Sequence, residues 1–276
     1  GKNIFPRCGE FTASLIRKCV LGEGSAAKPA EVPARPPVLC AGCPHRGVFY
    51  VLSKLKCNVL GDIGCYTLGA VPPLGSMDAV VCMGASVGMA IGFDKADPEA
   101  HKHSVAVIGD STFIHSGITG LIDAVYNKAK VTVVILDNRT TGMTGHQNHP
   151  ATGKTIKNED TYELDLAEVC RAVGVKNVRT VNPNDLAETE KAVKEELAKE
   201  EVSVIIAKKP CVLLTKKLYN GFKVNEKCKK CKACLKLGCP AIVNGKDGIT
   251  IDMSLCTECG LCQNVCKFGA IDGEVK

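Results

Sequence analysis

Several features are missing or scarce in this chain of 276 residues. The longest nearly apolar run, residues 79–93, is interrupted by glycines and is shorter than the roughly 18 residues of a spanning helix. No basic segment followed by an apolar one opens the chain, so no secretory signal is expected. Tryptophan is absent and aromatic residues make up only 4%, which leaves few rings to stack on nucleic-acid bases. We therefore expect a cytoplasmic protein that binds neither membranes nor nucleic acid.

Cysteine, by contrast, is abundant. The chain has 17 cysteines, and eight of them lie between Cys228 and Cys266. An odd number in a chain of this length argues against an extracellular disulfide scaffold and for intracellular metal or redox chemistry. The formal net charge is +6, and residues 208–236 hold ten lysines against one glutamate, Glu226. The basic excess is therefore concentrated in one segment.

Short apolar runs alternate with helical patterns from residue 36 to residue 211. This alternation predicts an α/β fold, an open and mostly parallel sheet with helices on both faces that binds ligands at the carboxyl ends of its strands. We expect strands at 58–63, 79–83, 104–108, 131–137, 175–181 and 202–208, and helices at 85–96, 114–128, 164–172 and 184–199. Residues 1–35 end in a Gly/Ala/Pro-rich stretch and are expected to be a linker from an upstream domain.

The tail contains two cysteine repeats. In each, three cysteines are spaced by two residues and a fourth follows, after four residues at Cys239 and after three at Cys266. Such triplets bind three corners of a 4Fe–4S cluster, and the fourth ligand comes from the other repeat. The predicted sets are Cys228, Cys231, Cys234 and Cys266, and Cys256, Cys259, Cys262 and Cys239. Residues 219–276 thus resemble a small α+β bacterial two-cluster ferredoxin; zinc, the alternative, would favour paired cysteines.

A second motif lies at the ends of two predicted strands. Asp110 follows the strand at 104–108 and Asn138 follows the next one, 28 residues later. Carboxylate and amide oxygens suit Mg²⁺, and amides after a strand-ending glycine can bind a diphosphate. The pattern is similar to the thiamine diphosphate motif, in which Asp110, Asn138 and the Thr140 carbonyl would hold the metal. A capped strand–turn–helix is the alternative.

Together with Cys40-x2-Cys43, Cys65 and Cys211, this motif resembles the thiamine diphosphate domain of the 2-oxoacid:ferredoxin oxidoreductases. The resemblance implies a proximal 4Fe–4S cluster on Cys40, Cys43, Cys65 and Cys211, the third in the chain. The implied cofactor-binding residues are Gly109, Asp110, Ser111, Thr112, Asn138, Thr140, Gly84, Ser86, His45 and His146. The motif order is most similar to members that act on arylpyruvates of the indolepyruvate type.

The resemblance also implies components outside this sequence. The glutamate that activates thiamine diphosphate would come from an upstream pyrimidine-binding domain of the same polypeptide, so no catalytic residue is assigned here and the chain alone is expected to be inactive. The other implied partners are a small (beta) subunit in a hetero-oligomer, ferredoxin and coenzyme A as co-substrate. The lysine-rich segment at 208–236 would dock acidic ferredoxin or offset the negative charge of the clusters.

The predicted activity is oxidative decarboxylation of arylpyruvates to acyl-CoA with ferredoxin as electron acceptor. Another 2-oxoacid:ferredoxin oxidoreductase is one alternative, and a polyferredoxin module without catalysis is a second. Binding of thiamine diphosphate distinguishes the enzymes from the module.

Overall fold

The computed structural model describes residues 2–24, 31–34, 36–215 and 219–275. The chain divides into two compact units, Gly1–Pro36 and Pro37–Lys276. The first contains helix α1 (Ala13–Leu21), which begins where the Thr12 hydroxyl accepts a hydrogen bond from the Leu15 amide. Part of the predicted linker is therefore helical. No helix in the described residues is long and apolar enough to cross a membrane.

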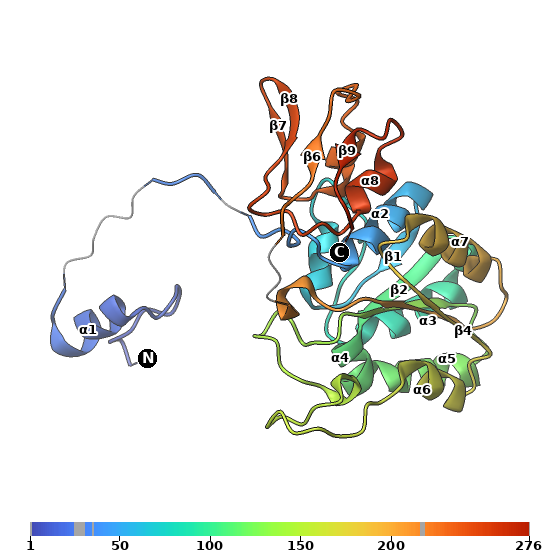
Figure 1. The fold of residues 1–276 in the computed structure, drawn as a ribbon. Coiled ribbons are helices and arrows are strands. Elements are labelled where there is room, and N and C mark those ends of the chain that lie inside the picture. Colours follow the sequence, from blue (N-terminus) through green and yellow to red (C-terminus); the bar gives the residue numbers. More distant parts are fainter. Residues whose placement is uncertain (1, 25–30, 35, 216–218, 276) are drawn as a thin grey trace. The chain divides into compact units, whose positions relative to one another are not determined.

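The second unit is built on five parallel strands in the order β1-β2-β3-β5-β4 (Figure 1). The strands are β1 (Asn58–Leu60), β2 (Ser104–Gly109), β3 (Thr132–Asp137), β4 (Asn177–Val181) and β5 (Ser203–Lys208). The whole of β2 and β3 is buried, as expected for parallel strands covered on both faces. This confirms the predicted α/β class.

The strand predicted at 79–83 does not form. Only Ala79 makes a bridge, to Leu60 at the edge of the sheet, and the Val81 and Met83 side chains are 69% and 49% exposed. The chain leaves the sheet after Ala79 and turns at Gly84 into the next helix. An apolar composition was therefore not sufficient evidence of a buried strand.

Two hydrophobic cores lie on opposite faces of the sheet. Successive residues of β2 point into them alternately, Val105 and Val107 into the first and Ala106 and Ile108 into the second. Helices α2 (His45–Leu55) and α7 (Leu186–Leu197) cover the first core; α3 (Ala85–Ala96), α5 (Ile118–Tyr126) and α6 (Leu166–Ala172) cover the second. Short helical turns complete the unit: η1 (Cys65–Ala70), η2 (Ala100–Lys102), α4 (Asp110–Thr112), η3 (Phe113–Gly117), η4 (Pro150–Thr152) and η5 (Val212–Leu214).

The tail forms a small α+β layer on the same compact unit (Figure 1). Its elements are β6 (Lys223–Val224), η6 (Ala233–Leu237), β7 (Ile242–Gly245), β8 (Gly248–Ile251), α8 (Leu261–Val265) and β9 (Ile271–Asp272). β6 pairs with β9, and β7 with β8, both antiparallel. The Asn184 side chain donates to the Cys259 carbonyl at 3.0 Å, and Asn264 donates to the Asn184 carbonyl at 2.8 Å. The tail is thus hydrogen-bonded to the loop before α7.

Gly47 allows α2 to approach that loop closely. A Cβ atom at Gly47 would lie 1.8 Å from the Pro183 carbonyl oxygen, so Gly47→Ala must move α2 or the loop. We expect a loss of roughly 1–3 kcal/mol in the free energy of unfolding, typical of overpacking. Gly88→Ala on α3 is the matched control: no atom lies within 4 Å of the new methyl group, and the helix should gain up to about 1 kcal/mol. Equal unfolding midpoints in urea for the two variants would contradict this prediction.

Candidate functional site

A pocket lies at the carboxyl ends of β2 and β3. Seven of its lining residues are predicted cofactor-binding residues. The other ten comprise Met83 together with one residue of β3 and residues of the loops around Cys65 and Gly142. The seven predicted residues are His45, Gly109, Asp110, Ser111, Thr112, Asn138 and Thr140. The fold thus gathers most of the predicted site in the place where open α/β sheets bind their ligands.

Three of the predicted cofactor-binding residues, Gly84, Ser86 and His146, do not line this pocket. Asp62 accepts hydrogen bonds from the Gly84 and Ser86 amides at the start of α3. Those amides are therefore already engaged by a protein carboxylate instead of facing the pocket. His146 is exposed at a turn, where it adopts a left-handed backbone conformation with φ +64°. Asp62 lies near the end of the predicted strand at 58–63, but no sequence feature assigned its carboxylate to a helix start 22 residues away.

Two buried carboxylates lie close together, Asp110 in the lining of the pocket and Asp137 beside it. The Arg139 amide donates to Asp110 Oδ2 at 2.9 Å and to Asp137 Oδ1 at 3.2 Å. His149, also buried, places its Nε2 3.2 Å from Asp110 Oδ2. The sequence analysis assigned no metal- or cofactor-binding role to Asp137 or His149, although Asp137 directly precedes Asn138. Such a concentration of negative charge suits a divalent cation.

The raised pKa of Asp137 should make the free energy of unfolding of the metal-free chain depend on pH. Burial, followed by the nearby Asp110 charge, raises that pKa to about 6. The folded state then holds this proton more strongly than the unfolded state, so the free energy of unfolding falls as pH rises from about 4 to 6. Asp137→Asn should remove this slope and stabilise the metal-free chain at pH 7 by roughly 1–3 kcal/mol.

Urea unfolding of both proteins in the presence of a chelator, at about pH 4 and pH 7, tests this prediction. The difference should be absent at the lower pH, where Asp137 is protonated in the folded and partly in the unfolded state. Equal stability at pH 7 would contradict it.

His45 orients Asn138 in the pocket. Burial lowers the pKa of His45 to about 4, so its ring is neutral at pH 7. Its Nε2 lies 3.3 Å from the Asn138 amide nitrogen, which can only donate, so Nε2 accepts and the ring proton is on Nδ1. The Thr140 amide donates to Asn138 Oδ1 at 3.2 Å. That oxygen keeps a second lone pair for a metal ion.

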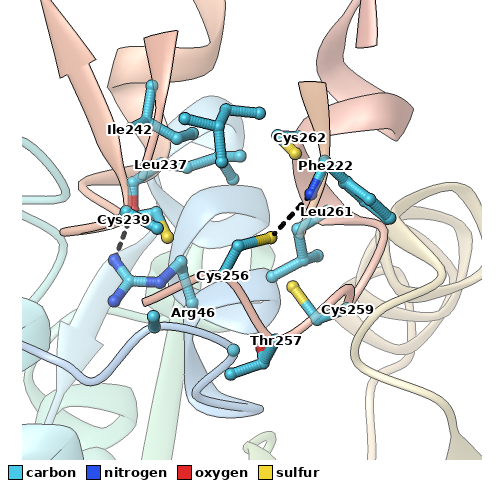
Figure 2. A pocket seen from close by; sticks show the side chains of 14 residues that line it. Arg46, Phe222, Leu237, Cys239, Ile242, Cys256, Thr257, Cys259, Leu261 and Cys262 are labelled. Atoms are coloured by element: carbon cyan, nitrogen blue, oxygen red, sulfur yellow. Dashed lines mark hydrogen bonds between the residues drawn. The ribbon is translucent and has the colours of Figure 1, made fainter. Parts of the chain in front are cut away.

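Four cysteines of the tail line one largely apolar cavity. They are Cys239, Cys256, Cys259 and Cys262, which we call the Cys239 set (Figure 2). The Phe222 amide donates to Cys256 Sγ at 3.4 Å, the type of contact that stabilises a thiolate in a cluster. Burial raises the pKa of Cys262 to about 12, so cluster binding would displace its proton.

The other four tail cysteines line a second cavity. Cys228, Cys231, Cys234 and Cys266, which we call the Cys228 set, share it with Lys229 and Lys232. Here the Ala270 amide donates to Cys266 Sγ at 3.4 Å. Cys231 and both lysines are exposed. Each cavity thus draws on both cysteine repeats.

The Cys40 set comprises Cys40, Cys43, Cys65 and Cys211. Burial is the main cause of the raised pKa of Cys43 and of Cys65, and the nearby thiols of Cys40 and Cys211 raise both further. The Cys211 amide donates to the Asn138 carbonyl at 2.8 Å. Cys65 lines the pocket that contains Asp110. The fold therefore places this set beside that pocket.

The donor groups fit the predicted cofactors. All 17 cysteines are free, and none is oxidised to a disulfide. Within the described residues, no three His, Cys, Asp or Glu side chains converge on a single ion. The fit rests on the chemistry of the donors: thiolates bind the irons of a cluster, and carboxylate, amide and carbonyl oxygens bind magnesium.

Comparison with known families identifies both parts of the chain. The family described as thiamine pyrophosphate enzyme, C-terminal TPP binding domain, matches residues 62–207. The 4Fe-4S binding domain family matches residues 249–272.

Curated relatives extend the similarity to nearly the whole chain. The Methanothermobacter thermautotrophicus protein named "Indolepyruvate oxidoreductase subunit IorA" is 38% identical over 98% of this chain and 46% of its own length. The Archaeoglobus fulgidus protein of the same name is 41% identical over 88% of this chain and 40% of its own. The chain thus spans about half the length of these relatives. Among solved structures, 2-oxoglutarate:ferredoxin oxidoreductase from Magnetococcus marinus shares the fold, with a TM-score of 0.54 at 18% identity over 66% of each chain.

Proposed function

The chain belongs to the thiamine pyrophosphate enzyme family and is related to IorA subunits, and from this we propose that it is the cofactor- and cluster-binding part of a 2-oxoacid:ferredoxin oxidoreductase. One observation carries the proposal. Cys65 lines the pocket that contains Asp110 and Asn138, and it lies near Cys40 and Cys211 as well. A pocket suited to Mg²⁺ and a diphosphate thus adjoins a set of four thiols suited to a redox cluster.

Residues of the chain hold and orient the cofactor in this proposal. Asp110, Asn138 and the Thr140 carbonyl bind Mg²⁺, and the loop from Gly109 to Thr112 receives the diphosphate. Neutral His45 accepts a hydrogen bond from the Asn138 amide nitrogen and so orients the Asn138 oxygen, which keeps one lone pair for the metal beside its bond from the Thr140 amide. Gly109 leaves no room for a side chain, because a Cβ there would lie 2.5 Å from the Tyr66 ring. When bound, thiamine diphosphate supplies the carbanion chemistry that decarboxylates a 2-oxoacid.

The Cys40, Cys239 and Cys228 sets would each hold a 4Fe–4S cluster, and these groups would supply the one-electron chemistry needed to pass electrons from the pocket to ferredoxin. The exposed Lys229 and Lys232, at the rim of the Cys228 cavity, attract the acidic partner.

The substrates in this proposal are arylpyruvates of the indolepyruvate type, and coenzyme A accepts the acyl group. The activating glutamate comes from an upstream pyrimidine-binding domain, and a small (beta) subunit completes a cytoplasmic hetero-oligomer. Without them the chain has little turnover of its own.

The test is reduction of a viologen dye by the complete complex, purified anaerobically, with indolepyruvate, pyruvate or 2-oxoglutarate and coenzyme A. We expect reduction with indolepyruvate at the highest kcat/KM, and about twelve iron atoms per chain. Activity with only the aliphatic acids would refute the substrate assignment. A complex that binds no thiamine diphosphate would instead favour the polyferredoxin module.

A further inference from the structure

Arg46, in the first turn of α2, is a buried cation at the contact between the sheet and the tail. Its side chain is 2% exposed. One guanidinium nitrogen donates to the Leu237 carbonyl at 2.6 Å (Figure 2). The other donates to the carbonyls of Leu39 and Cys40 at 2.6 and 2.8 Å. The guanidinium therefore joins η6 in the tail to the loop that contains Cys40.

This position lies between two of the cysteine sets. Arg46 lines the cavity of the Cys239 set, and one of its acceptors is the carbonyl of Cys40 in the neighbouring set. The loop of Cys40 also lies close to the tail here: a Cβ at Gly42 would lie 1.9 Å from the hydroxyl oxygen of the Thr257 side chain. Burial raises the pKa of the Cys43 and Cys259 thiols, and in both cases the Arg46 charge opposes that rise. The Arg46 charge thus lowers the pKa of a thiol in the Cys40 set and of a thiol in the Cys239 set.

Among the residues that the structure describes, no carboxylate forms an ion pair with Arg46. Its hydrogen bonds all go to neutral carbonyls, and its Nε has no partner among the described residues. A buried charge that is not compensated is costly, and the penalty falls when an opposite charge lies nearby. A 4Fe–4S cluster with four thiolates is negatively charged and becomes more negative on reduction. Clusters in the two flanking sets would provide the missing negative charge.

We propose that Arg46 is a positioning residue that raises the reduction potentials of the clusters in the Cys40 and Cys239 sets and makes the Cys239 cluster the middle member of the electron route. The inference rests on the proposed function, because it requires clusters in these sets. The route runs from the pocket to the Cys40 set, then to the Cys239 set beside Arg46, and last to the Cys228 set. The Cys228 cavity is lined by tail residues alone and is bordered by exposed lysines, so it is the exit to ferredoxin.

The test is an EPR-monitored redox titration of the complete complex carrying Arg46→Gln. A reduced cluster is favoured by a nearby positive charge, so its removal should lower both potentials. At a fixed applied potential we expect the ratio of reduced to oxidised Cys239 cluster to fall by about tenfold, the scale on which outer-shell groups tune a metal site. The Cys228 cluster should keep its potential. Arg46→Lys, which retains the charge, should restore the potentials at least in part.

Lys236→Gln is the matched control, because it removes a charge of the same sign from an exposed tail position outside both tail cavities. Solvent screens that charge, so all three potentials should stay unchanged. Unchanged potentials in Arg46→Gln, or an equal shift of the Cys228 cluster, would refute the proposal.

A second measurement needs no variant. In the wild-type complex labelled with ¹⁵N-arginine, pulsed EPR of the reduced Cys239 cluster should detect a coupled ¹⁵N nucleus, and its absence would also refute the proposal. A complex that lacks clusters contradicts the proposed function itself. A complex with about twelve irons and substrate-dependent dye reduction but no effect of Arg46 contradicts only this inference.

Discussion

Asp110→Asn is expected to weaken Mg²⁺-dependent binding of thiamine diphosphate to the complete complex by more than about a hundredfold, since even the groups behind metal ligands contribute roughly 10- to 100-fold. Asp110 lies at the end of β2, is buried, and faces both Asp137 and His149. The substitution preserves the shape of the side chain and removes its charge. It therefore removes the charge of a proposed metal ligand with little effect on packing.

Isothermal titration of thiamine diphosphate in the presence of Mg²⁺ measures this effect, and unfolding in urea shows whether the fold is retained. Asp123→Asn is the matched control, because it removes the same charge from the exposed surface of α5, outside the pocket. If Asp110→Asn and Asp123→Asn bind the cofactor equally, Asp110 is not a metal ligand.

Cys65→Ala is expected to separate cofactor binding from electron transfer. Cys65 is the one predicted cluster ligand that also lines the cofactor pocket among the described residues. Without it the Cys40 set has three thiolates, and the iron content should fall by about four atoms per chain. Thiamine diphosphate should still bind, because Asp110, Asn138 and Thr140 are unchanged. Substrate-dependent viologen reduction should fall to background, because no cluster remains next to the pocket.

Cys82→Ala provides the control, since Cys82 is exposed and belongs to none of the three sets. It should retain all its iron and full dye reduction. A Cys65→Ala complex that keeps about twelve irons would show that the third cluster is bound elsewhere, or that Cys65 is dispensable as a ligand.

The sequence was most informative where the relevant residues are close together along the chain. Cysteines spaced by two residues predicted the two tail sets, and the structure places each set around its own cavity. The strand-end positions of Asp110 and Asn138 likewise predicted a shared pocket, because parallel neighbouring strands end at the same edge of a sheet. The apolar stretch at 79–83 misled the strand assignment, because composition does not reveal whether a segment has a neighbour to pair with.

By itself, therefore, the sequence determined the α/β class, the ferredoxin-like tail and the two tail sets of candidate ligands, since these depend on local periodicity and spacing. The Cys40 set was implied by the family resemblance. Only the tertiary structure decided which groups surround those ligands. Asp62 occupies the start of α3, His149 faces Asp110, and Arg46 links η6 to the loop of Cys40. The partners in the Arg46–Leu237 contact are 191 residues apart. Folding brings such residues together through the packing of whole elements, and no local pattern records that outcome.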